Sequence, residues 1–116
     1  MTVWIALALS LLVSLITVLA SRGVIPNNGL VGIRTPAITY SDNSWRQGHA
    51  AATPVIIATT VIVVFGAILL LIVTRDSTTD ATNFAGLGLL ALEVVGIVAA
   101  AIRGNKYASR DLQNQP

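Results

Sequence analysis

The side chains that can do chemistry gather in one stretch of this chain. Arg34 lies in the run Gly32-Ile33-Arg34-Thr35-Pro36. Its guanidinium carries five N–H donors in a rigid fork, which suits a carboxylate, a phosphate or several backbone carbonyls. Pro36 restricts the backbone of Thr35 to extended forms, and this restriction helps to fix where Arg34 points. The run therefore predicts a binding site for a lipid headgroup, a peptide terminus or a partner loop.

A tryptophan and the single histidine extend this candidate site. If Ser41 or Asp42 caps a helix that begins before Trp45, then Trp45 and His49 lie one turn apart on one helical face. The alternative is that Trp45 anchors the helix in the headgroup layer, that the neighbouring arginine reaches phosphate groups, and that Arg34 only ties the loop to the helix ends. The candidate binding residues of this stretch are Asn28, Arg34, Thr35, Trp45, Arg46 and His49.

One further candidate, Glu93, lies near the centre of a long apolar segment. Gly86, Leu89, Gly96 and Ala100 share its helical face, where the glycines let a neighbouring helix approach. A charge at the centre of a bilayer is costly, so Glu93 is expected to point into the helix bundle or into a partner protein. We expect a protonated carboxyl that is hydrogen-bonded to a Ser or Thr of another helix. The functional alternative is contact with an ion, a proton or a ligand.

Composition excludes most other chemistry. The chain is 54% hydrophobic and only 10% charged, whereas soluble domains carry roughly 25% charged residues, so a bilayer is its natural solvent. It has no cysteine and one histidine, which excludes thiolate chemistry and a multi-histidine metal site within the chain. Its formal charge of +2 is small and its basic residues are dispersed, which argues against nucleic-acid binding. We therefore expect no enzyme activity, no cofactor, no metal site and no nucleic-acid partner.

Three apolar segments, at about 3–21, 50–74 and 81–102, are long enough to cross a bilayer. No basic residue precedes the first segment, which favours a membrane span over a cleaved signal peptide. Pro54 fits the first turn of the second helix. The predicted fold is an all-α membrane protein with three transmembrane helices. Residues 1–116 form a single membrane domain, with a long ordered cytoplasmic loop at 22–49 and a polar tail at 103–116.

A stripe of small polar residues marks one face of the first segment. Its members, at spacings of four, three and four, are Ser10, Ser14, Thr17 and Ser21. Small polar residues let helices approach closely and hydrogen-bond to each other. The stripe therefore predicts a helix interface, and a path for a polar ligand is the alternative.

The basic residues favour one orientation in the membrane. Those of the long loop and the tail are Arg22, Arg34, Arg46, Arg103, Lys106 and Arg110. The short loop at 75–80 holds Arg75 beside Asp76 and Asp80. Because cytoplasmic segments gather Lys and Arg, we expect the N-terminus and the short loop outside, and the long loop and the C-terminus in the cytoplasm.

The motif resembles that of the SdpI-type bacterial immunity proteins, of which this chain would be a short, three-helix member. These proteins share an Asn, then Gly-Ile-Arg-Thr-Pro four residues on, then a Trp and a His four residues apart. Here those positions are Asn28, residues 32–36, Trp45 and His49, and the hydrophobic helix that follows also fits. Two positions depart from the common pattern, since Ala37 replaces a Trp and Gly48 replaces a Thr.

The resemblance implies a non-enzymatic protein of the bacterial plasma membrane. Such a protein protects its cell from a secreted toxic peptide, or relays the presence of that peptide to a regulator. The alternative is an accessory structural subunit packed on a larger membrane protein complex, because so small a chain cannot enclose a pore alone. A small drug–proton exchanger fits less well, since those proteins use four helices and an acid in the first. The lipid bilayer is the one expected contact in every case, and homo-oligomer formation stays open.

Overall fold

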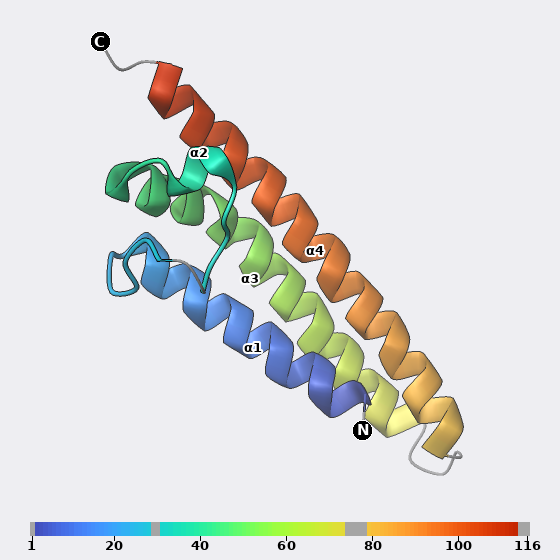
Figure 1. The fold of residues 1–116 in the computed structure, drawn as a ribbon. Helices are drawn as coiled ribbons and strands as arrows, with labels where there is room; N and C mark the ends of the chain where they lie inside the picture. The colour runs from blue at the N-terminus through green and yellow to red at the C-terminus, as the bar shows by residue number, and fades with distance from the viewer. Residues whose placement is uncertain (1, 29–30, 74–78, 114–116) are drawn as a thin grey trace.

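The computed structural model describes residues 2–28, 31–73 and 79–113. Across these ranges the secondary structure is entirely helical: α1 (Thr2–Ser21), α2 (Pro36–Thr39), α3 (Asp42–Val73) and α4 (Thr79–Gln113). The three long helices pack side by side in a bundle 62 Å long and 21 by 18 Å across (Figure 1). The short α2 packs against α3 and α4 near the C-terminal end of α4 (Figure 1).

Three of these helices, α1, α3 and α4, are long and apolar enough to cross a membrane. Large apolar side chains cover their outward faces: Trp4 is 61% exposed, Phe65 69% and Phe84 78%. A soluble monomer rarely exposes so much contiguous apolar surface, whereas in a bilayer these side chains contact lipid. The prediction of an all-α protein with three helices able to span a membrane is confirmed for the described residues.

The prediction of a long loop at residues 22–49 is wrong. Ser41 caps α3, since its Oγ accepts the N–H of Ser44 at 3.0 Å and its carbonyl accepts the N–H of Trp45 at 2.9 Å. Asp42 to His49 therefore belong to α3, and α2 occupies part of the remainder. Hydrophobicity alone does not place the start of α3, because its first turns are polar in sequence and yet bury several of their side chains.

Two further boundaries differ from the sequence analysis. Pro54 lies in the interior of α3 and not in its first turn, so it has no N–H to donate to the carbonyl one turn earlier. Residues 103–113, expected to be a polar tail, continue α4, and Ala108 of this extension packs with Ile38 and Trp45. Of the short loop at 75–80, only Thr79 and Asp80 lie within the described residues, and both belong to α4.

Small residues let α3 and α4 approach closely. Gly96 of α4 faces the side chain of Thr59. A Cβ at Gly104 would lie only 2.6 Å from the carbonyl oxygen of Gly48. The face of α4 predicted to point inward does so, since Gly86, Glu93, Gly96 and Ala100 are all buried.

The polar stripe of α1 also lies at a helix interface. Ser10 Oγ donates to Thr60 Oγ1 of α3 at 3.1 Å, and Ser14 forms a short hydrogen bond with the same hydroxyl. Thr17 is buried and donates to the carbonyl of Val13 at 2.8 Å. These contacts agree with the predicted packing role of the stripe.

Candidate functional site

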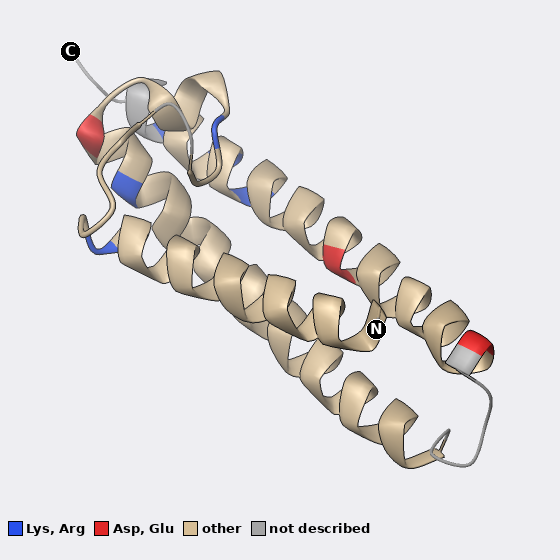
Figure 2. Cartoon of the chain, turned by 60° about the horizontal axis from the view of Figure 1, so that its bottom comes forward, with Lys and Arg blue, Asp and Glu red and all other residues tan. Residues whose placement is uncertain are grey.

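The two ends of the bundle differ in charge. Figure 2 shows the Lys and Arg residues of the described chain gathered toward one end, which we call the basic end. Arg22 follows α1, Arg46 lies in the second turn of α3, and Arg103 and Lys106 lie in the last turns of α4. Asp80 lies at the opposite end, in the first turn of α4. The basic end therefore attracts anions and anionic surfaces.

The residues of the sequence motif fold over the basic end as a unit that we call the motif cap. It consists of residues 22–28 and 31–41 together with residues 42–49 at the start of α3. Its centre is Trp45, which is 1% exposed and packs with Ala20, Ile38 and Ala108. The indole Nε1 donates to the carbonyl of Ile25 at 2.9 Å. Because Trp45 is buried, its interpretation as an anchor in the headgroup layer is wrong.

His49 lies beside Trp45, as the spacing predicted. The two ring centroids are 4.3 Å apart and the planes are tilted by 47°. His49 is fully buried, with Nδ1 against the carbonyl of Trp45 at 2.7 Å and Nε2 accepting the N–H of Ile33 at 3.0 Å. These partners assign a neutral ring that donates through Nδ1 and accepts through Nε2. His49 thereby ties the motif run to α3.

Gly32 makes this contact possible. Its φ is +105°, a backbone conformation that favours glycine. A Cβ at this position would lie 2.8 Å from Cη2 of Trp45 and 3.0 Å from Nε2 of His49. A glycine is therefore required at the first position of the Gly-Ile-Arg-Thr-Pro run, both because of its positive φ and because the rings of Trp45 and His49 leave no room for a Cβ.

Asn28 and Thr35 shape the backbone on either side of Arg34. The side chain of Asn28 donates to the carbonyl of Pro26 at 2.7 Å and accepts the N–H of Val31 at 2.8 Å. Thr35 is extended, with φ −81° and ψ 156°, as Pro36 predicted, and its Oγ1 accepts the N–H of Ile38 as the N-cap of α2. Both side chains are therefore engaged in building the cap.

Arg34 is exposed and only partly engaged. Its Nε donates to the carbonyl of Asn28 at 2.9 Å. Among the described residues its two terminal guanidinium nitrogens have no hydrogen-bond partner. Arg46 is also exposed and lies over Gly23, where a Cβ would be 3.3 Å from its Cδ. The cap thus holds Arg34 in place and leaves the outer edge of its fork available.

The structure keeps Glu93 apart from the motif cap. Glu93 lies near the middle of α4. It is 1% exposed, and neither of its carboxyl oxygens has a hydrogen-bond partner among the described residues. It points into the bundle, as predicted, but the expected hydrogen bond to a Ser or Thr of another helix is not formed within the part of the chain that the structure describes.

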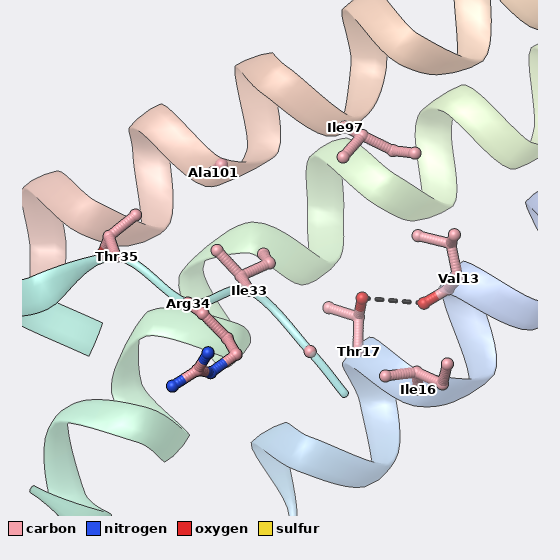
Figure 3. A pocket seen from close by; sticks show the side chains of 9 residues that line it. Val13, Ile16, Thr17, Ile33, Arg34, Thr35, Ile97 and Ala101 are labelled. Atoms are coloured by element: carbon pink, nitrogen blue, oxygen red, sulfur yellow. Dashed lines mark hydrogen bonds between the residues drawn. The ribbon is translucent and has the colours of Figure 1, made fainter. Parts of the chain in front are cut away.

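A cavity of about 400 Å³ lies beneath the motif cap, between α1 and α4 (Figure 3). Val13, Ile16 and Thr17 line it from α1, Ile97 and Ala101 from α4, and residues 32–35 from the cap. Sequence reasoning missed its apolar walls, because these side chains look like any other lipid-facing or packing residues. Only Thr17, a member of the polar stripe, and the motif run itself gave a signal.

Together the fold and the site define a class: a small membrane protein whose three long helices carry an ordered motif cap at one end. A family model described as the SdpI/YfhL protein family matches residues 24–103. The chain therefore belongs to this family, and the match includes every candidate binding residue named above. No curated protein and no solved structure matches the chain.

Proposed function

We propose that this chain is a non-enzymatic protein of the bacterial plasma membrane that protects its cell against a secreted toxic peptide. The observation that carries the proposal is that the family motif forms the ordered motif cap, within a family match over residues 24–103. In this proposal the whole chain forms one membrane domain, with the motif cap and the C-terminus in the cytoplasm and the N-terminus outside. The basic end supports this orientation, because cytoplasmic segments gather Lys and Arg.

The residues of the cap divide into two roles. Asn28, Thr35, Trp45 and His49 position the motif run through hydrogen bonds that stay within the cap. Arg34 binds, because its fork is exposed and its terminal nitrogens are available for a carboxylate or a phosphate. Arg46 adds a second exposed cation at the same end of the bundle.

Arg34→Lys tests the binding role, since Lys keeps the charge and loses the fork. We expect the variant to reach normal protein levels and a nearly unchanged unfolding temperature, while protection of cells exposed to the toxic peptide falls. Arg110→Lys is the control, because Arg110 lies outside the motif cap near the end of α4. A parallel loss of stability and protection would mean that Arg34 only ties the cap together. Full protection by Arg34→Lys at normal expression would exclude Arg34 as the binding residue.

Affinity purification in a gentle detergent distinguishes this proposal from an accessory subunit. We expect the protein to elute alone or as a homo-oligomer. Recovery of a stoichiometric larger complex, identified by mass spectrometry, would favour the accessory subunit instead.

A further inference from the structure

The cavity between α1 and α4 has no role in the function proposed above. Its volume of about 400 Å³ falls within the range of roughly 300–1,000 Å³ found for small-molecule sites. At the opposite end of the bundle the two helices touch directly, since Thr2 Oγ1 donates to the carbonyl of Asn83 at 2.7 Å. Beneath the motif cap the space between them is unfilled. An unfilled apolar volume forfeits packing contacts, so an apolar occupant would stabilise the bundle.

The position of the cavity along α1 matches the part of a lipid acyl chain that lies next to the headgroup. Its deepest lining residue on α1, Val13, lies eight residues before Ser21, the last residue of α1. At 1.5 Å per residue this is about 12 Å along the helix axis. The 20 residues of α1 match a hydrocarbon core of roughly 30 Å. The cavity therefore lies in the hydrocarbon layer next to the basic end, directly below the level of the headgroups.

The side chains that line the cavity offer mostly hydrocarbon. The two hydroxyls in it are already engaged: Thr17 donates to the carbonyl of Val13, and Thr35 accepts the N–H of Ile38. A peptide segment would bring backbone N–H and C=O groups that need partners in such surroundings. An acyl chain brings none, and this difference favours a lipid over a peptide.

The charge lies at the rim and not in the interior. Figure 3 shows the guanidinium of Arg34 turned away from Val13 and Ile97. Its terminal nitrogens have no hydrogen-bond partner among the described residues. A phosphate outside the cavity can therefore accept two parallel hydrogen bonds from this fork.

We propose that the cavity holds one acyl chain of an anionic phospholipid whose phosphate lies against Arg34. This inference deepens the proposed function and rests on it, because it names the ligand of the same arginine. The lipid fills the space between α1 and α4 and fixes the motif run from below.

Native mass spectrometry of the full-length protein, delipidated in detergent and titrated with phosphatidylglycerol or phosphatidylcholine, tests the proposal. We expect one phosphatidylglycerol to bind wild type at concentrations at which phosphatidylcholine does not. Ala101→Phe fills the cavity and Arg34→Gln removes the fork, and each should weaken phosphatidylglycerol binding by about tenfold or more. Val13→Phe fills the cavity from the other wall, so the test does not depend on one variant folding. Ala99→Phe, at an exposed site two residues away on α4, is the control and should bind like wild type.

Equal binding of phosphatidylglycerol by wild type, Ala101→Phe and Val13→Phe would overturn the proposal. Equal binding of the two lipids by wild type would overturn its anionic part. A cavity that takes the toxic peptide and rejects phosphatidylglycerol would overturn it in favour of a peptide site. A protection assay on the same variants tests the lipid site and the proposed function separately. If a variant no longer binds phosphatidylglycerol but still protects the cell fully, the lipid site is supported and its part in protection is contradicted. If Ala101→Phe or Val13→Phe still binds phosphatidylglycerol but no longer protects the cell, the lipid site is contradicted and the proposed function is not.

Discussion

Each ring nitrogen of His49 holds a different part of the chain. Nδ1 donates to the carbonyl of Trp45 within α3, and Nε2 accepts the N–H of Ile33 from the motif run. If Nε2 were protonated, it could no longer accept the N–H of Ile33, and two N–H groups would face each other. His49 is therefore a positioning residue, and its titration or metal coordination would require the motif cap to open.

Glu93 is also buried, and its carboxyl oxygens have no hydrogen-bond partner among the described residues. We expect Glu93→Gln to keep the fold, Glu93→Lys to prevent it, and Glu93→Leu to raise the free energy of unfolding by about 1–3 kcal/mol, because it removes buried polar atoms without partners. Thermal unfolding in one detergent measures the effect. Asp80→Asn, at an exposed site in the first turn of α4, is the control.

A Glu93→Leu variant less stable than wild type would contradict this prediction and show that the carboxyl finds a partner in the membrane. Loss of protection by Glu93→Gln at normal protein levels would show that an ionised carboxylate matters for function.

At the scale of the helices, glycines at the interface decide how closely α3 and α4 approach. Gly104 lies against the backbone of Gly48, whereas a Cβ at Gly88 would meet nothing within 4 Å. We expect Gly104→Ala to lower the free energy of unfolding by about 1–3 kcal/mol, because the two backbones must move apart. Gly88→Ala, the matched control, should raise it by up to about 1 kcal/mol through helix propensity. Chemical unfolding of both variants in the same detergent compares them. Equal stabilisation by the two substitutions would contradict the close approach.

The same crossing explains why Gly48 stands where many SdpI-type proteins carry a Thr. A Cβ at Gly48 would lie 2.5 Å from Cγ1 of Ile38. Ile38 of α2 is fully buried beside Trp45 and Ala108. The glycine therefore makes room for α2 between the motif run and the extended end of α4.

For the whole molecule, the separation of charge between the two ends predicts its topology. The chain has no cysteine, so single cysteines can be placed freely. We expect Ser77→Cys, which lies outside the described residues, to react with a membrane-impermeant thiol reagent in intact cells. Ser41→Cys and Ser109→Cys, at the basic end, should react only after the membrane is permeabilised. Labelling of Ser41→Cys from outside would reverse the assignment.

The sequence alone determined the membrane class, the three long helices, the inward face of α4 and the place of the motif. These properties follow from apolar length, from helical periodicity and from residue types at fixed spacing, all of which are local along the chain. The pairing of Trp45 with His49 followed in the same way, because one turn of helix separates them.

Only the tertiary structure decided what depends on residues far apart in sequence. The first turns of α3 are polar by composition, and they bury Trp45 and His49 only because the ends of α1 and α4 and the small α2 close over them. The cavity below the motif cap exists because α1, α4 and residues 32–35 meet around it. No local pattern encodes such a space, since the same apolar side chains would serve equally well toward lipid or toward another helix. For the same reason the sequence placed Glu93 inside the bundle but could not show that its carboxyl finds no partner among the described residues.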